Sequence, residues 1–342
     1  MSRRPTIRDV AERAGVHPGT ASRALNPAHP GRIAEPTASR VRAAARDLGY
    51  TPDPTARSLR TRRSGIVGVV VPDLTNPVLP PIVRGIEETL WRAGLACLVA
   101  DTDNDVEREA VAVRELQARR CEGLVIASAT RDSATVRALA GGDIPAVLVT
   151  RDVDGAGLAF VAGDDAAGVE AAARHLVGLG HERIAYLAGP PELSTTATRL
   201  AAVRRTLTGT AEPVVVFCDA YAIAAGRRVA RDLLAAHPGV TAILAGNDMV
   251  AIGVYEALAE TGLRCPADVS VAGHNDMPLV DKLAPPLTTV AIPRAEIGVA
   301  AARRLLAGLR GEDEPARRTL LPTRLVVRGS TAPPRTPAGQ SR

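Results

Sequence analysis

A short run close to the N-terminus combines small residues, hydroxyls and one arginine in an arrangement that suits contact with a nucleic acid. The run GVHPGTASRALN spans residues 15–26. Small residues let a helix backbone approach bases closely, hydroxyls donate to phosphates, and a long arginine donor reaches a guanine edge. The residues that a helix here places on one face are Gly19, Thr20, Ser22 and Arg23. Ordinary helix-surface polarity explains the two hydroxyls equally well, so the surrounding elements must decide.

Three short helices are predicted around this run. The first begins after Thr6, which with Asp9 resembles a capping box in which Asp replaces the usual Glu. Gly15 suits the end of that helix, and Pro18 suits the first turn of the second, where its missing N–H has no partner to lose. The third runs from about Pro36 to Leu48. Three helices with a tight glycine turn between the first two predict a helix-turn-helix, whose second helix enters the major groove of DNA.

The positive charge of the chain is concentrated in this N-terminal part. Residues 1–64 hold 13 arginines and five acids, a net charge of +8, whereas the whole chain of 342 residues carries +5, so the remainder carries −3. A basic end on a mildly acidic body is typical of a part that binds a polyanion. A solvated arginine-rich surface is the alternative that charge alone leaves open.

The segment after the third predicted helix, YTPDPTARSLR over residues 50–60, suits a linker that folds only on binding. Two prolines open it, and a helix of one or two turns after them is marginal in water. Leu59 lies between Arg57 and Arg60, which suits an apolar wedge pushed between base steps in the minor groove. Packing of Leu59 on the rest of the protein is the alternative.

Together these motifs resemble those of the LacI/GalR family of bacterial transcription regulators. The resemblance is carried by TIRDVAERAGVHPGTASRALN and GYTPDPTARSLRTRRSGIVGVVVPDLTNP, and it extends over about residues 5–330. The DNA contacts that it implies are Thr6, His17, Pro18, Gly19, Thr20, Ser22, Arg23, Asn26, Ala56, Leu59 and Arg60. The chain departs from the family at His17, where a serine is usual, and in a longer loop, Pro27–Gly31.

From residue 66 onward, short β-branched runs alternate with alanine-rich amphipathic segments, which is typical of parallel sheets wound on both faces. The candidate strands are Ile66–Val71, Leu95–Ala100, Gly123–Ala127, Ala146–Thr150, Arg183–Ala188, Val214–Cys218, Ala242–Ala245 and Val269–Ala272. They suffice for two lobes, and ligands of such folds bind beyond the carboxyl ends of the strands, between the lobes. The predicted fold class is an all-α helix-turn-helix head followed by an α/β body of two doubly wound parallel-sheet lobes.

The resemblance implies that this body is periplasmic-binding-protein-like, with three crossings of the chain between its lobes. The implied divisions are a head over residues 1–50, a hinge over 51–64 and an effector-binding and dimerisation domain over 65–330, in which the N-lobe takes about 65–161 and 293–320 and the C-lobe about 162–292 and 321–330. Residues 331–342 are proline-rich and polar, which predicts a disordered tail. The tail lacks leucine heptads, so a homodimer is the expected unit.

The resemblance also implies an effector site at the strand ends of the body. Its residues are Leu74, Asn76, Asp103, Ser128, Arg151, Arg199, Tyr221, Asn247 and Asn275. The guanidinium of Arg199 is expected to donate paired hydrogen bonds to a carboxylate or to sugar hydroxyls, and the ring of Tyr221 is expected to stack on the ligand. Asp103 is alternatively a helix cap, and of Asn247 and Asp248 one is expected to bind ligand while the other caps a helix.

Two features bear on the class of ligand. Asn275 stands where the family often has aspartate, which removes a bidentate acceptor for sugar hydroxyls. The chain is also only 2% aromatic, whereas sugar sites favour aromatic platforms. A sugar remains the favoured effector, and a purine, another small metabolite or no ligand at all are the alternatives.

Motifs for catalysis, cofactors, metals and membranes are missing from the sequence. No G-x-G-x-x-G follows the first strand, and no P-loop, nucleophile elbow, metal-spaced histidine cluster or triad is found, so we expect no enzyme, cofactor or metal site. The four cysteines lie far apart without CxxC pairing, which is typical of reduced thiols. No apolar run is long enough to span a membrane, and MSRRPTIRD is followed by no signal-like apolar stretch, so a cytoplasmic protein without a membrane partner is expected.

The sequence therefore predicts a DNA-binding transcriptional regulator, a repressor that grips a palindromic operator as a dimer and is switched by a small molecule between its lobes. A corepressor-dependent regulator responding to a purine is one alternative. A solute-binding protein without a DNA role is another, against which the basic head and the absence of a signal peptide speak. An enzyme acting on a nucleotide sugar is the third, and it lacks a catalytic constellation.

Overall fold

The computed structural model describes residues 5–25, 32–51, 63–209, 213–312 and 317–335. The chain forms two compact units, Met1–Ser64 and Gly65–Arg342, here called the head and the body. Among the described residues, no helix has the length and apolar character needed to cross a membrane.

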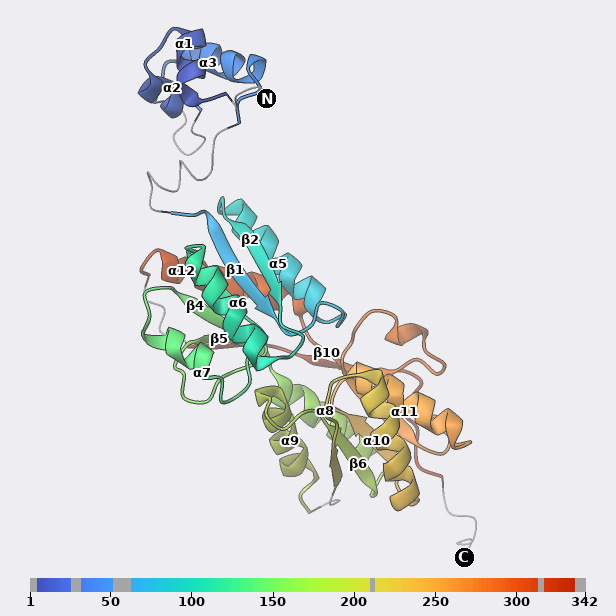
Figure 1. Cartoon of the computed structure of the whole chain (residues 1–342). Helices are drawn as coiled ribbons and strands as arrows, with labels where there is room; N and C mark the ends of the chain where they lie inside the picture. Colours follow the sequence, from blue (N-terminus) through green and yellow to red (C-terminus); the bar gives the residue numbers. More distant parts are fainter. Residues whose placement is uncertain (1–4, 26–31, 52–62, 210–212, 313–316, 336–342) are drawn as a thin grey trace, which may run out of the picture. The chain divides into compact units, whose positions relative to one another are not determined.

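The head consists of three helices, α1 (Ile7–Ala14), α2 (Pro18–Ala24) and α3 (Glu35–Asp47) (Figure 1). The predicted capping box forms, because the N–H and the hydroxyl of Thr6 both donate to the Asp9 carboxylate, at 2.6 and 2.8 Å. Gly15 ends α1 with a φ of 62°, a conformation that favours glycine, and so allows the tight turn into α2. The small core that holds the helices together comprises Val10, Ala11, Ala14, Ala21, Val41, Ala44 and Ala45.

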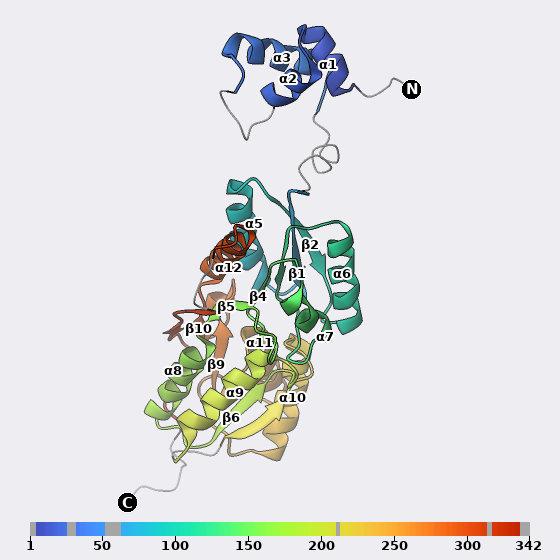
Figure 2. The ribbon, with the colours of Figure 1, turned by 90° about the vertical axis from the view of Figure 1, so that its left-hand side faces the viewer.

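The first lobe of the body, the N-lobe, is a six-stranded parallel sheet in the order β11-β5-β4-β3-β1-β2. Its strands are β1 (Ile66–Val71), β2 (Ala96–Asp101), β3 (Gly123–Ile126), β4 (Ala146–Val149), β5 (Ala159–Gly163) and β11 (Arg318–Leu321). Its helices are α5 (Leu79–Arg92), α6 (Val106–Ala118), α7 (Ala134–Arg137), η1 (Ala138–Gly141) and α12 (Arg294–Leu309). Figure 2 shows α5 and α12 on one face of the sheet and α6 on the other. Alternation along β1 explains this, because Val69 packs with the α5 side and Val70 with the α6 side.

The second lobe, the C-lobe, is a six-stranded sheet in the order β12-β10-β9-β8-β6-β7. Its strands are β6 (Ile184–Ala188), β7 (Val214–Phe217), β8 (Ala242–Ala245), β9 (Ser270–Asn275), β10 (Thr288–Ala291) and β12 (Arg324–Val326). Its helices are α8 (Asp165–Gly178), α9 (Ser194–Leu207), α10 (Ile223–Ala236), α11 (Asp248–Glu260) and η2 (Val280–Lys282). Tyr186 packs with α8 and α9, whereas its neighbour Leu187 packs with α10 and α11, so helices cover both faces. The lobe departs from a purely parallel sheet at its edge, where β12 pairs antiparallel with β10.

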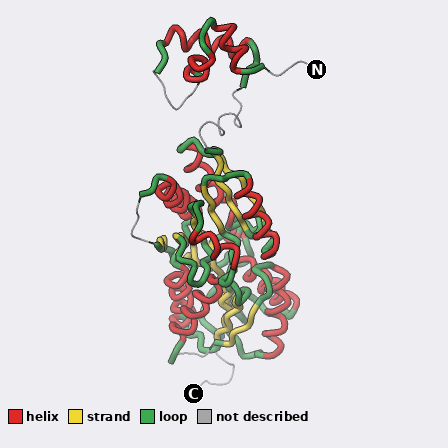
Figure 3. Tube along the Cα trace, turned by 60° about the vertical axis from the view of Figure 1, so that its left-hand side comes forward, coloured by secondary structure: helices red, strands yellow, loops and turns green. Residues whose placement is uncertain are grey.

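The chain crosses between the lobes three times. Figure 3 traces the chain with its helices in red and its strands in yellow. The crossings follow β5, β10 and β11. The expected divisions after residues 161 and 320 fall inside β5 and β11, so the structure moves those crossings to the strand ends, near Asp164 and Thr323. These crossings place the starts of α8 and α12 beside the junction of the lobes.

The prediction of a disordered tail is wrong for residues 331–335, which pack on the C-lobe. The Thr331 hydroxyl hydrogen-bonds to the His175 ring at 2.9 Å, and the Ala332 carbonyl accepts from the His181 ring at 2.9 Å. Arg335 pairs with Asp268 at 2.8 Å. Composition misled here, because a few specific hydrogen bonds and one ion pair anchor a segment that has almost no apolar residues. Residues 336–342 lie outside the described part of the chain.

Candidate functional site

The start of α2 carries the polar residues of the predicted DNA-contacting face. His17 is the N-cap of this helix, and its Nδ1 accepts a hydrogen bond from the N–H of Gly19 at 3.1 Å. The capping role expected of a serine in the family is thus performed here by an imidazole. Arg23 is exposed, and its Nε donates to the Gly19 carbonyl at 3.1 Å. Pro18, Thr20 and Ser22 are half-buried in the head.

The remaining predicted DNA contacts divide into two groups. Thr6 has its hydroxyl engaged in the capping box of α1. Asn26, Ala56, Leu59 and Arg60 lie outside the described residues, as do the whole loop Pro27–Gly31 and most of the predicted hinge.

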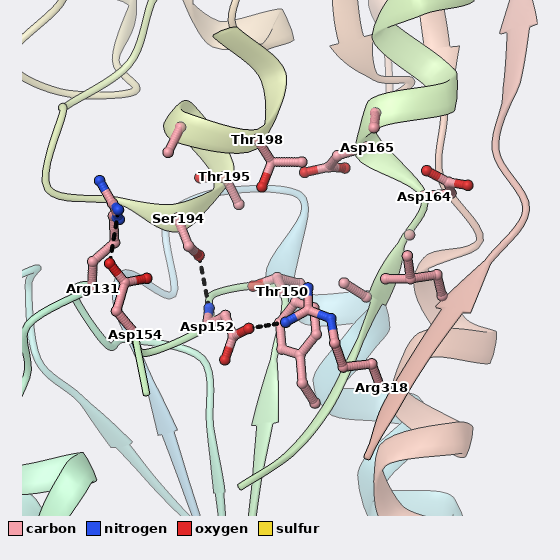
Figure 4. Close-up of a pocket in the computed structure, with 16 residues that line it drawn as sticks. Arg131, Thr150, Asp152, Asp154, Asp164, Asp165, Ser194, Thr195, Thr198 and Arg318 are labelled. Atoms are coloured by element: carbon pink, nitrogen blue, oxygen red, sulfur yellow. Dashed lines mark hydrogen bonds and ion pairs between the residues drawn. The ribbon is translucent and has the colours of Figure 1, made fainter. Parts of the chain in front are cut away.

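Two adjoining cavities lie between the lobes of the body. The first, here called the amide-rich cavity, has a volume of about 70 Å³. The predicted effector residues that line it are Asn76, Arg151, Arg199, Tyr221, Asn247 and Asn275. The second, the aspartate-rich cavity, has a volume of about 350 Å³ and is shown in Figure 4. Its charged lining comprises Asp152, Asp154, Asp164, Asp165, Arg131 and Arg318. Residues from β5 and from the starts of α8 and α9 separate the two cavities and line both.

The other three predicted effector residues line neither cavity. Leu74 is 43% exposed, and its N–H donates to Asp101. Asp103 is exposed and pairs with Arg108. The alternative that Asp103 caps a helix is also wrong, because the N-cap of α6 is Asp105, two residues later. Ser128 is buried and donates its hydroxyl to the carboxylate of Glu109.

The charged group at the base of the amide-rich cavity is built from three elements of the C-lobe. Arg199 of α9 pairs with Asp165 of α8 at 2.9 Å and donates to the Gly246 carbonyl at 2.7 Å. His274 of β9 approaches the second oxygen of the same carboxylate at 3.1 Å. Burial opposes ionisation of Asp165, but the Arg199 charge and the His274 hydrogen bond outweigh it and hold the pKa of Asp165 below its usual value. Burial and the Arg199 charge lower the pKa of His274, so the imidazole is neutral at pH 7.

Tyr221 occupies a space that two glycines create. A Cβ on Gly189, which follows β6, would lie 2.2 Å from the Tyr221 ring, and one on Gly246, which follows β8, would lie 3.2 Å from it. The Tyr221 hydroxyl hydrogen-bonds to Thr196 at 3.0 Å, and the Arg199 guanidinium lies 5.9 Å from the ring centroid. The aromatic side chain is therefore held rigidly at the wall of the cavity.

The paired residues at the start of α11 have separate roles. Asn247 caps the helix by accepting from the N–H of Val250 at 2.8 Å, and it also lines the cavity. Asp248 is fully buried and accepts from the N–H of Met277 at 2.8 Å and from the Thr289 hydroxyl at 2.6 Å. It therefore holds the residues that directly follow β9, whose last residue, Asn275, has a φ of 118° and lines the cavity.

The N-lobe contributes Arg151 from a strained turn after β4. The N–H of Arg151 donates to the Val149 carbonyl at 2.6 Å, and the residue between them, Thr150, has a φ of 60°. A β-branched residue in this conformation stores on the order of 1–3 kcal/mol of strain, and such strain is concentrated at functional sites. Thr150 lines both cavities. The sequence offers no signal for this turn, because nothing in the pattern VLVTRDVD distinguishes it from an ordinary strand end.

Direct hydrogen bonds close the lobes onto each other beside the aspartate-rich cavity. The N–H of Asp152 donates to the Ser194 hydroxyl across the lobes at 2.7 Å, as Figure 4 shows. The N–H of Arg131 donates to the Glu192 carbonyl at 2.9 Å. Asp152 is also held within its own lobe by an ion pair with Arg318. These contacts form between segments that have no sequence motif in common, and sequence reasoning missed them.

Replacing Ser194 with alanine should accelerate hydrogen exchange at the Asp152 amide about fivefold, because one interlobe hydrogen bond contributes about 1 kcal/mol. The amide of Asp154, which donates to the Arg131 carbonyl within the N-lobe at 2.8 Å, provides the internal control. Equal exchange at Asp152 in the wild type and the variant would show that this bond does not hold the lobes together.

The body and the head match two described families. Residues 6–53 match bacterial regulatory proteins of the lacI family. Residues 173–331 match the periplasmic binding protein-like domain. Among solved structures, the chain is similar to the lac repressor dimer bound to operator and the anti-inducer ONPF, with a TM-score of 0.88 and 31% identity over 96% of this chain and 100% of that chain. It is also similar to a complex of the transcriptional regulator CelR with cellobiose, with a TM-score of 0.72 and 29% identity over 96% and 100% of the two chains.

Curated relatives match over nearly the whole length of the chain. The HTH-type transcriptional regulator DegA of Bacillus subtilis is 31% identical over 96% of this chain and 98% of its own. A ribose operon repressor of Halalkalibacterium halodurans is 30% identical over 95% and 97%. The transcriptional repressor CytR of Escherichia coli is 30% identical over 95% and 96%. With a lacI-type head, a two-lobed body and this identity from end to end, the chain belongs to the lacI family of bacterial regulatory proteins.

Proposed function

We propose that this chain is a transcriptional repressor that binds a palindromic operator as a homodimer and is released by a small molecule between its lobes. The observation that carries the proposal is the presence, in one chain, of a lacI-type head and of a polar cavity closed by two lobes. Similarity to a dimeric lac repressor on its operator supports the operator and dimer parts.

The DNA contacts of the proposal are the eleven residues named from the sequence. Within the described part of the head, α2 provides an exposed Arg23 for a base edge, while its half-buried hydroxyls Thr20 and Ser22 suit phosphate contacts. Ala56, Leu59 and Arg60 are proposed as minor-groove contacts of the hinge.

For the effector, a sugar is favoured. Relatives described as ribose operon repressors and a structural neighbour that holds cellobiose support this class. We assign the binding role to the six predicted residues that line the amide-rich cavity and withdraw it from Leu74, Asp103 and Ser128. Among these six, Arg199 also pairs with Asp165 and donates to the Gly246 carbonyl, and so it holds the cavity wall as well.

The proposed switch follows from differential affinity. A ligand that contacts both lobes stabilises the closed body, and the closed and open bodies place the two hinges of a dimer differently. A ligand that binds the DNA-free state more tightly weakens DNA binding by the same factor by which DNA weakens ligand binding. A corepressor is the alternative sign of the same coupling, and a purine is the alternative ligand.

The chain acts by binding alone, without turnover of its effector, since all the curated relatives named above are transcriptional regulators. It works in the cytoplasm, where a bacterial regulator meets its DNA. Turnover of any bound candidate effector would show instead that the chain is an enzyme.

Changing Arg23 to glutamine should weaken operator binding about 10- to 100-fold and leave binding to unrelated DNA nearly unchanged, because a base-edge contact discriminates by about 1–3 kcal/mol. Fluorescence anisotropy with both DNAs at two salt concentrations measures this. Arg13→Gln is the matched control, since Arg13 is an exposed arginine of α1. An equal loss on both DNAs would assign Arg23 to the phosphate backbone.

A further inference from the structure

The two interlobe cavities differ in the balance of their charges. The described lining of the aspartate-rich cavity has four carboxylates and two guanidinium groups. The described lining of the amide-rich cavity has two guanidinium groups, on Arg151 and Arg199, and one carboxylate, on Asp165. That carboxylate is already shared between Arg199 and His274. The amide-rich cavity therefore carries one positive charge that its own lining does not balance.

The unbalanced charge is that of Arg151. Its guanidinium donates to the Ser128 carbonyl at 3.0 Å and to the Asn104 side-chain oxygen at 2.9 Å, and both acceptors are neutral. Among the described residues, no carboxylate lies within ion-pair distance of it. Two carboxylates act on Arg151 through their charge without an ion pair, the buried Glu109 and the exposed Glu192. The Glu109 carboxylate is engaged by the hydroxyls of Ser128 and Ser133. Burial lowers the pKa of Arg151 to about 10, as expected of a desolvated cation.

The start of helix α9, in the C-lobe, also favours an anion. Helix α9 has 14 residues and follows Leu193, and no side chain caps its first turn. In that turn, Thr195 is 8% exposed and lines both cavities, and its buried hydroxyl finds no partner among the described residues. Free N–H groups at a helix start, together with the macrodipole, favour an anion. The orphaned hydroxyl adds one more donor to them.

Arg151 of the N-lobe and Thr195 of the C-lobe both line the amide-rich cavity. Their chain neighbours Asp152 and Ser194 form the 2.7 Å hydrogen bond that joins the lobes (Figure 4). A group that bridges Arg151 and Thr195 therefore links the N-lobe to the C-lobe.

We infer that the effector carries an anionic group, a carboxylate or a phosphate, which binds between the Arg151 guanidinium and the first turn of α9, where the Thr195 hydroxyl donates to it. The inference rests on the proposed effector site and narrows its ligand class to acidic compounds such as sugar acids or phosphosugars. The anion supplies the missing counter-charge and, by contacting both lobes, stabilises the closed body.

Thermal unfolding of the full chain in the presence of simple probes tests this inference. The probes are inorganic phosphate, acetate and D-glucuronate, with sodium chloride at equal ionic strength and D-glucose as the neutral references. Phosphate or the carboxylates should raise the melting temperature of the body beyond the chloride reference. Arg151→Gln should require about 10- to 100-fold more probe for the same shift, because a charge-assisted hydrogen bond is lost. A preference for phosphate or for the carboxylates decides which anion the site takes.

Two further variants separate the site from general effects of charge and folding. Thr195→Val keeps the shape and charge of the side chain and should weaken the response about 3- to 10-fold. Arg131→Gln removes the same charge from the aspartate-rich cavity and should respond like the wild type. Because every variant keeps the arginine-rich head, anions bound by the head affect all of them equally. The inference is overturned if no probe anion exceeds the chloride reference, or if Arg151→Gln responds as the wild type does.

Operator binding, measured on the same preparations without probes, keeps this result apart from the proposed function. An anion response without operator binding would leave the anion site standing and remove the repressor role. Operator binding without an anion response would support the repressor role and overturn the anion site.

Discussion

Replacing Arg199 with methionine should lower the free energy of unfolding of the body by about 3–5 kcal/mol, because removing one partner of a buried ion pair leaves an uncompensated charge. Both side chains of the pair are nearly inaccessible, with Arg199 at 7% and Asp165 at 13% exposure. The substitution also leaves the Gly246 carbonyl without its donor. Urea unfolding of the wild type and the variant measures the loss.

The same two helices provide a matched control for this substitution. Arg205 of α9 pairs with Glu170 of α8, but the Arg205 side chain is 61% exposed. Arg205→Met should therefore cost less than about 1 kcal/mol, as exposed ion pairs do. Equal losses in the two variants would mean that burial does not increase the contribution of the Arg199–Asp165 pair to the free energy of unfolding. Packing would then stabilise the base of the cavity instead.

The free energy of unfolding of the body should fall as pH rises from about 4 to 7. The substitution Asp248→Asn should abolish this pH dependence. Burial raises the pKa of Asp248 to about 7, more than its hydrogen bonds from Thr289 and Met277 lower it. The folded state therefore binds a proton that the unfolded state has released above about pH 4. The protonated carboxyl stabilises the fold fully below that pH, and this stabilisation is lost as pH approaches 7.

Over this window, the wild type should lose about 4 kcal/mol relative to Asp248→Asn, which cannot titrate. Urea unfolding at intervals of half a pH unit follows the difference between the two proteins. Asp219→Asn, at a carboxylate that is 73% exposed, should track the wild type throughout. A constant difference between the wild type and Asp248→Asn would show that Asp248 is ionised in the fold at all these pH values.

Much of the fold could be predicted because its elements leave strong local signals. The runs IVGVVV and AILA are continuous apolar strands, and the predicted bounds of β1 and β8 match the structure. Strands β5, β10, β11 and β12 were missed, although β8 is no longer than most of them, because they lie where the chain passes between the lobes. At that junction, topology rather than periodicity determines the pairing, and β11 joins β5 from more than 150 residues away.

The candidate site came from the family resemblance, and six of its nine residues line one cavity. A position just after a strand does not suffice, because Leu74, Asp103 and Ser128 follow β1, β2 and β3 yet line neither cavity. Asp165 was missed, because its partners Arg199 and His274 are 34 and 109 residues away and no pattern connects them. The role of Thr195 could not be predicted from the sequence. It depends on the uncapped start of α9 and on the position of the N-lobe opposite it.

The most direct test of the repressor assignment is a titration of fluorescent DNA from the upstream region of the protein's own gene with the full chain, at two salt concentrations, with and without a panel of neutral and acidic sugars and nucleosides. The account predicts tight binding to a palindromic site that weakens steeply with salt and that one compound abolishes. A compound that strengthens binding would reverse the sign of the switch. Equal binding to all DNAs, with a compound still bound tightly by the body, would contradict the account and leave a ligand-binding protein without an operator.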